Sequence, residues 1–272
     1  MFLPEVPKFG SPYSMSRRGV VATACMIGLV LAGCARGPAG PSSATPRRTL
    51  PAASATAPGP ADGPVSLGGA AAYAVIARGD VTVRSTPAAA APALLRIPAK
   101  LRWGTPTPFL VHQARRVDGK LWYWVLLPQR PNQSSGWVPA DQVRVSPRDR
   151  RADVDLSARR LTLYQGSDAV GTFPVAIGQS ATPTPTGRFF VTVRLRPPQI
   201  STIYGAWALG LSAYSEVLDQ FGTGDGQIAL HGTNDSSELG RAITHGCVRL
   251  DNASISKLAA QLPPGSPVDI HA

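Results

Sequence analysis

One cysteine and two histidines lie close together within residues 230–250, which read LHGTNDSSELGRAITHGCVRL. His231 precedes Cys247 by sixteen residues and His245 precedes it by two. A free thiol has a pKa of about 8.5 and is mostly protonated at neutral pH. An adjacent imidazole can take that proton and leave a nucleophilic thiolate beside an imidazolium. The pattern therefore predicts a cysteine nucleophile, Cys247, with a histidine as its base.

Glycines follow both histidines, and Gly246 directly precedes the cysteine. Glycine lets the backbone turn tightly and lets a substrate approach it closely. Backbone N–H groups of residues 246–248 could then face a developing oxyanion, each contributing on the order of 3 kcal/mol. A zinc site would need three or four ligands, and His-Gly-Cys is cramped for two of them. We therefore predict neither a metal nor any other cofactor.

Two short motifs carry a resemblance to a known family. His231 begins H-G-T-N, and Thr244 begins T-H-G-C-V-R-L. Together they are similar to the signature of L,D-transpeptidases of the YkuD type. The resemblance covers residues 152–271, including the TPTG turn at 184–187 and a closing PVDI strand.

That resemblance implies a β-sandwich-like catalytic domain that acts on peptidoglycan stem peptides. The cysteine would attack the carbonyl of the L-centre of diaminopimelate in a tetrapeptide, and D-Ala would leave. An amine of a neighbouring stem would resolve the thioester, which gives a 3→3 cross-link. Carbapenem-type β-lactams would be covalent inhibitors of such an enzyme.

Carried over by position, Cys247 is the nucleophile and His231 is the base and later the acid. Gly232 would orient the imidazole through its carbonyl group. Thr244 and His245 lie in the motif and would shape the site.

Two further residues keep alternative roles. Arg249 would either meet a substrate carboxylate or brace the loop. Tyr204 would either line the donor pocket or pack in the core.

Two other functions remain open. Water could resolve the thioester in place of an amine, which would make the protein an L,D-carboxypeptidase or hydrolase. The chain could also be a non-catalytic lipoprotein that binds peptidoglycan. Replacing Cys247 distinguishes this last alternative, because an inactive wall-binding module would not depend on the thiol.

The amino-terminal residues predict export. Arg17 and Arg18 precede an apolar stretch at 19–33 that is short for a membrane span and right for a signal peptide. The stretch ends Leu-Ala-Gly-Cys, which resembles the lipobox of bacterial lipoproteins. Residues 1–34 are therefore predicted to be a signal peptide with a lipobox, and translation could start at Met1 or Met15. Cys34 would carry the lipid that anchors the protein to the outer face of the membrane, in the cell envelope.

The mature chain is predicted to have three parts. Residues 35–72 are rich in Ala, Pro, Gly and Ser and predict a disordered tether. Residues 73–146 predict short strands and resemble bacterial SH3-like domains, in which the matching pieces are DVTVRSTP, WYWV and GWV. Such domains often bind peptidoglycan, although a spacer role is the alternative. Residues 152–272 predict the catalytic domain, mainly β, with a single helix at 251–262.

The chain has 27 Lys and Arg against 16 Asp and Glu, a formal charge of +11. Anionic wall polymers, anionic lipid and nucleic acid would all attract such a surface. No run of five or more basic residues occurs, so a nucleic-acid-binding tail is not expected. The fold class predicted is mainly β, with a small SH3-like barrel followed by a β-sandwich-like catalytic domain.

Overall fold

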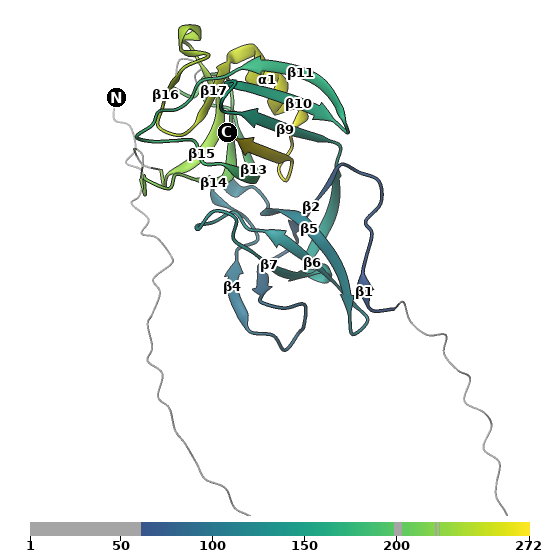
Figure 1. The fold of residues 1–272 in the computed structure, drawn as a ribbon. Coiled ribbons are helices and arrows are strands. Elements are labelled where there is room, and N and C mark those ends of the chain that lie inside the picture. The colour runs from purple at the N-terminus through teal and green to yellow at the C-terminus, as the bar shows by residue number, and fades with distance from the viewer. Residues whose placement is uncertain (1–60, 199–202, 221, 223) are drawn as a thin grey trace, which may run out of the picture. The chain divides into compact units, whose positions relative to one another are not determined.

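The computed structural model describes residues 61–198, 203–220, 222 and 224–272. The predicted signal peptide, Cys34 and most of the predicted tether lie outside these residues. Strands dominate the described part of the chain, so the mainly β prediction is confirmed (Figure 1). Its single α-helix, α1 (Asn252–Gln261), lies within the predicted range. No helix in the described ranges is long and apolar enough to cross a membrane.

The amino-terminal half of the described chain forms one antiparallel sheet in the order β4-β3-β7-β6-β5-β2-β8, with β1 beside β5. Strand β3 shows why these residues form strands: Val81 and Val83 are buried, and the residues between and after them are not. The strands are β1 (Gly63–Pro64), β2 (Ala72–Ala77), β3 (Val81–Arg84), β4 (Ala93–Ile97), β5 (Pro108–Val117), β6 (Lys120–Leu126), β7 (Ser135–Pro139) and β8 (Val143–Arg148), with short 3-10 turns η1 (Arg102–Gly104) and η2 (Ala140–Gln142).

This sheet has a core of its own, built from buried residues such as Phe109, Tyr123 and Val138. The resemblance to bacterial SH3-like domains stays a prediction. The structure corrects the end of the predicted tether. Val65 donates its N–H to the carbonyl of Ala114, and Val65 packs against the core. Residues 63–72 therefore belong to the folded part of the chain, because β1 pairs with β5 and both Val65 and Leu67 pack against the core.

The second sheet has the order β11-β10-β9-β18-β13-β14-β15-β17. Its pairs are antiparallel except β9–β18 and β15–β17, which are parallel. The strands are β9 (Arg150–Asp155), β10 (Arg160–Gln165), β11 (Asp168–Pro174), β13 (Gly187–Leu195), β14 (Ala208–Tyr214), β15 (Gln227–Thr233), β17 (Val248–Asp251) and β18 (Pro267–His271); β12 (Ile177–Gly178) pairs separately with β16 (Ala242–Thr244), and η3 (Ser236–Glu238) is a short 3-10 turn.

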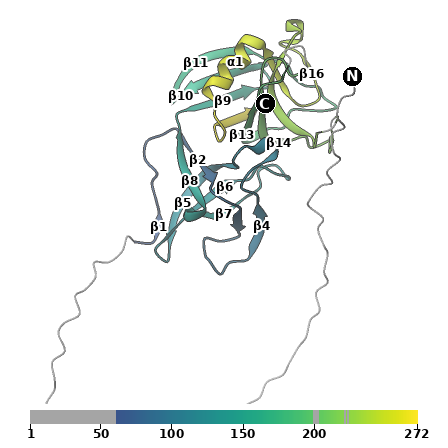
Figure 2. The same cartoon turned by 180° about the vertical axis from the view of Figure 1, so that it is seen from behind.

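Helix α1 closes the core of the second sheet (Figure 2). Ile255, Leu258 and Ala259 are its buried side chains, and they pack with Leu230 of β15 and Leu250 of β17. One face of β15 and β17 is therefore fixed against the core. The opposite face of the same two strands is left for other side chains.

The helix starts at a side-chain cap. Asp251 accepts a hydrogen bond from the backbone N–H of Ser254 at 2.8 Å through its Oδ1 atom. This cap satisfies one of the N–H groups that the first turn of a helix leaves without a partner. Because Asp251 is also the last residue of β17, the cap joins the helix directly to that strand.

We expect Asp251→Ala to lower the free energy of unfolding by about 1 kcal/mol, the usual contribution of an N-cap. Asp251→Asn should keep most of that stability, because an asparagine side chain caps equally well. Chemical denaturation monitored by circular dichroism measures both values. A loss of stability in Asp251→Asn as large as that in Asp251→Ala would show that the charge acts, and not the cap.

Candidate active site

Strands β15 and β17 bring the predicted base and nucleophile to one face of the sheet. They run parallel, with Leu230 opposite Val248 and His231 opposite Arg249. Leu230 is buried in the core, so strand alternation places His231 on the opposite face. Cys247 directly precedes β17, and its sulfur accepts a hydrogen bond from the backbone N–H of Ala229. Cys247 and His231 are thus offset by two residues on neighbouring strands, about 7 Å along the strand direction.

The imidazole of His231 is held by the next residue in the chain. Its Nδ1 atom lies 2.8 Å from the carbonyl oxygen of Gly232, as the resemblance implied. A carbonyl oxygen can only accept, so Nδ1 carries the proton. The Nε2 atom of a neutral ring is then left with its lone pair. His231 is therefore set in the tautomer that can take a proton from a thiol.

Burial favours the neutral form of both His231 and Cys247. His231 is only 3% exposed, and burial lowers its pKa to about 4, an effect to which the Arg249 cation adds. The Gly232 carbonyl and the Glu238 carboxylate act in the opposite direction. Burial also raises the pKa of the Cys247 thiol, although the Ala229 hydrogen bond and Arg249 oppose this. These shifts favour a protonated thiol and a neutral imidazole at neutral pH.

The loop before the cysteine is held by one hydroxyl group. Thr244 is buried and donates to the carbonyl oxygen of Cys247 at 2.6 Å. The same hydroxyl accepts the N–H of Gly246 at 3.1 Å. The expectation that this N–H faces an oxyanion is therefore wrong, because it already has an acceptor. Of the three backbone N–H groups predicted to face the oxyanion, those of residues 246–248, the N–H of Cys247 belongs to the predicted nucleophile itself.

Gly246 adopts a φ of 113°, in the region that side chains with a Cβ rarely enter. A Cβ there would also lie 2.9 Å from the Cδ1 atom of Ile228, closer than real Cβ atoms approach. A second threonine braces the loop from outside: Thr182 donates to the carbonyl of Thr244 at 3.0 Å. His245, between the buried residues Thr244 and Gly246, is exposed.

Tyr204 lies over the catalytic histidine. Its ring meets that of His231 edge to face, with centroids 5.2 Å apart. Burial raises the pKa of Tyr204, and the charge of a Cys247 thiolate raises it further, so the phenol lies near the nucleophile as well. The side chain is still 40% exposed. Of the two roles considered for Tyr204, this position favours the pocket over the core.

The turn at residues 204–207 is bound to the main chain of the catalytic strand. The N–H of Gly232 donates to the carbonyls of Tyr204, at 3.0 Å, and Trp207, at 3.1 Å. The side chain of Asn252 at the start of α1 accepts the N–H of Ala206 at 2.7 Å. Asn252 thus fixes the turn that carries Tyr204.

Arg249 is paired inside the protein. Its Nη1 atom lies 2.6 Å from Oε1 of Glu238, and Oε2 of Glu238 accepts the hydroxyl of Thr233 at 2.9 Å. Of the two roles considered for Arg249, this contact favours the brace. Glu238 has no signal in the sequence, since Asp235 stands in the same loop and would have been an equal candidate. No group of three His, Cys, Asp or Glu side chains placed to hold a metal ion occurs within the described ranges.

Comparison with known proteins identifies a family at these residues. Residues 149–270 match the model of the YkuD L,D-transpeptidase catalytic domain. The YkuD protein of Bacillus licheniformis, which is named as an L,D-transpeptidase, is 34% identical over 152 residues, covering 53% of this chain and 84% of that one. The YqjB protein of Bacillus subtilis, named in the same way, is 30% identical over 126 residues, covering 45% of this chain and 71% of its own length.

Among solved structures, L,D-transpeptidase 3 from Mycobacterium tuberculosis in complex with a faropenem-derived adduct is 13% identical, with a TM-score of 0.38. The match covers 56% of this chain and 91% of that one. At that score the likeness supports no inference about this chain. The sequence match to the Bacillus licheniformis protein is the stronger finding, since it extends over most of that relative. On this basis the chain belongs to the L,D-transpeptidase family.

Proposed function

We propose that the protein is an L,D-transpeptidase that forms 3→3 cross-links in peptidoglycan through a thioester on Cys247. One observation carries the proposal: His231 lies on β15 with Nδ1 fixed on the Gly232 carbonyl, and Cys247 immediately precedes the neighbouring parallel strand β17. The substrate class follows from membership of the family. The reaction follows from what a thiol and a neutral imidazole can do together.

In the first half-reaction the sulfur of Cys247 attacks the carbonyl carbon of the donor peptide, and its proton passes to Nε2 of His231. The N–H of Cys247 donates to the oxyanion that forms. The intermediate collapses, the bond to the D-Ala nitrogen breaks, and the imidazolium returns its proton to that nitrogen. D-Ala leaves as the free amino acid, and the donor remains as a thioester.

In the second half-reaction the amine of a neighbouring stem attacks the thioester carbonyl. His231 accepts the proton that this nitrogen loses, and the carbon–sulfur bond breaks. The thiolate then takes the proton back from the imidazolium. The same two residues would serve a water molecule in place of the amine, in which case the product is a free tripeptide. Mass spectrometry of the products separates cross-linking from hydrolysis.

We further propose that the protein is exported and anchored to the membrane by a lipid on Cys34. The support is the charged and apolar segment before it and the Leu-Ala-Gly-Cys sequence. The basic charge of the chain and a wall-binding role for residues 73–146 would keep the catalytic domain close to anionic wall polymers.

We expect globomycin, which blocks the lipoprotein signal peptidase, to leave the protein unprocessed in cells. The Cys34→Ala variant should lose the acyl chains and leave the membrane fraction, as detected by mass spectrometry and immunoblotting. Unchanged processing in globomycin would refute the lipid anchor. It would leave the catalytic proposal untouched.

We expect Cys247→Ala to abolish both the thioester with a tetrapeptide donor and the covalent adduct with a carbapenem, as measured by intact-protein mass. His231→Gln should slow acylation by about 10²- to 10⁴-fold, the usual contribution of a general base. His271→Gln is the matched control, because this histidine is exposed and hydrogen-bonded to Asp153 on another strand. An unchanged muropeptide profile in cells carrying Cys247→Ala would favour a non-catalytic wall-binding protein.

The pH dependence should show the unusual pKa of His231. A base is active when neutral, so the acylation rate should stay level from pH 8 down to about 5 and fall only near a pH of about 4. An inflection near pH 6.5 would contradict this, because it would belong to an exposed histidine. Circular dichroism at each pH serves as the control for folding.

The same pKa predicts a change in stability. Between pH 6.5 and about 4 the unfolded chain binds a proton at His231 that the folded protein does not. The free energy of unfolding should therefore fall by about 3 kcal/mol as the pH drops through this window. Urea denaturation across the window measures the fall, and His231→Gln should remove that part of it.

A further inference from the structure

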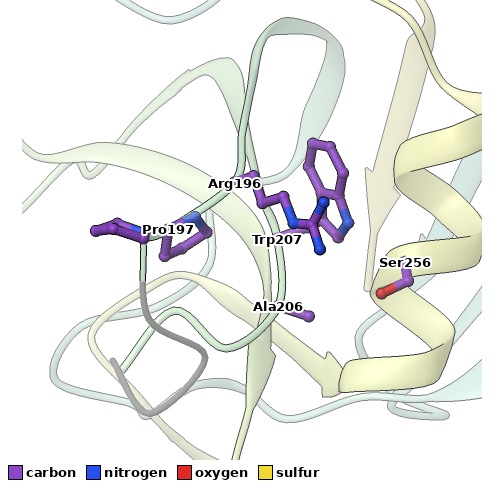
Figure 3. A pocket seen from close by; sticks show the side chains of 6 residues that line it. Arg196, Pro197, Ala206, Trp207 and Ser256 are labelled. Atoms are coloured by element: carbon purple, nitrogen blue, oxygen red, sulfur yellow. The ribbon is translucent and has the colours of Figure 1, made fainter.

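A cavity of about 340 Å³ lies beside the turn at residues 204–207 (Figure 3). Its lining residues come from the segment after β13, from the turn itself and from α1; they are Arg196, Pro197, Pro198, Ala206, Trp207 and Ser256. The turn carries Tyr204 against His231 at one end and Trp207 into the cavity at the other. The cavity is therefore separated from the catalytic histidine by a single turn of backbone.

Arg196 places a positive charge at this cavity, and no acid among the described residues neutralises that charge. Its guanidinium lies over the indole of Trp207, 5.9 Å from the ring centroid. Within the described part of the chain, Arg196 has no ion pair with an acid. The indole lies on one side of the guanidinium, and no described residue accepts a hydrogen bond from its N–H edges. Those edges match the two oxygens of a carboxylate.

Arg194, two residues earlier in the chain, differs from Arg196 because its side chain has a hydrogen-bond partner within the protein. Arg194 donates to the carbonyl of Ala259 in α1 at 2.7 Å, so its side chain has a structural use. Arg196 is exposed and has no such acceptor among the described residues. Within the described ranges its guanidinium contacts Trp207, which also lines the cavity.

The rest of the lining fits a peptide beside that carboxylate. Ser256 donates its hydroxyl to the carbonyl of Asn252 at 2.7 Å, which leaves the oxygen of Ser256 able to accept an N–H. Pro197 and Pro198 have no N–H groups to satisfy and offer apolar ring surface. The lining thus combines a cation, an acceptor and apolar walls.

Hydrogen bonds connect this cavity to β15 and to the start of α1. Gly232 donates its N–H to the carbonyl of Trp207, and its own carbonyl holds Nδ1 of His231. Asn252 accepts the N–H of Ala206, which lines the cavity. A ligand in the cavity would therefore be held at a fixed distance from the reacting carbonyl.

We propose that this cavity is a carboxylate-binding subsite for a peptidoglycan stem peptide, with Arg196 paired to the carboxylate and Ser256 accepting an amide N–H of the stem. The inference rests on the proposed function, and both the donor and the acceptor stem carry suitable carboxylates. The test separates these two sources.

The two half-reactions are measured separately, as thioester formation with a tetrapeptide donor and as transfer from that thioester to an acceptor stem. Each stem is used with its free carboxylate and as the carboxamide. We expect Arg196→Gln to raise the KM of the carboxylate form by about 10- to 100-fold in one of the two steps, with kcat little changed. The carboxamide form should show almost no difference, because it cannot pair with the cation.

Arg196→Lys should recover part of the loss, since it keeps the charge but not the two parallel hydrogen bonds. Arg160→Gln is the matched control, an exposed arginine on β10 in the same sheet. Alkylation of Cys247 by iodoacetamide, a neutral reagent, should proceed equally in all variants if the catalytic pair is intact. An effect on the donor step or on the acceptor step supports the subsite and identifies its occupant.

The same KM for Arg196→Gln and the parent in both steps would overturn the proposal. Should the parent itself show no turnover, binding of the stem peptide to Cys247→Ala is measured by calorimetry with and without Arg196→Gln. Weaker binding of the carboxylate form alone would then support the subsite even though the proposed reaction failed. Equal binding would refute it.

Discussion

The site depends on a single hydrogen bond, from Nδ1 of His231 to the carbonyl of Gly232. The bond fixes the ring, decides which nitrogen bears the proton and needs no second side chain. It works because the main chain of Gly232 is itself fixed, through its N–H, to the carbonyls of Tyr204 and Trp207. A Cβ at Gly232 would collide with the side chain of Asn252 and crowd the turn. The absence of a side chain therefore lets the catalytic strand, the turn and the helix start meet at one residue.

Burial then decides the chemistry of the pair. Two charged groups in this position would both have to be removed from water, which is costly unless each is fully compensated. The structure leaves both neutral, with the pKa of His231 at about 4 and that of Cys247 raised. Charge appears only when the sulfur attacks and the proton transfers. The proposed mechanism therefore uses no preformed thiolate, and a protonated thiol is less open to oxidation than a thiolate.

The sequence was informative where a local pattern has one structural meaning. The His-Gly and His-Gly-Cys motifs placed the base and the nucleophile, and the apolar spacing after Asp251 placed α1. The sequence did not predict the features that depend on tertiary contacts. Strand β14 (Ala208–Tyr214) is rich in small residues and is buried along almost all of its length, so it lacks the alternation that marks a half-buried strand. Glu238 and Asn252 act through partners far from them in sequence, and one chain alone does not reveal such pairs.

The two arginines near the site show how pairing controls where an anion can bind. Arg249 faces the catalytic groups, but Glu238 lies 2.6 Å from it and compensates its charge. A substrate carboxylate there would have to displace an acid that also holds Thr233. Arg196 instead lies over an indole, which attracts a cation without cancelling its charge. The arginine whose charge no described acid compensates is therefore Arg196, on the far side of the turn that contacts His231, where it could pair with a substrate carboxylate without adding a positive charge beside that histidine.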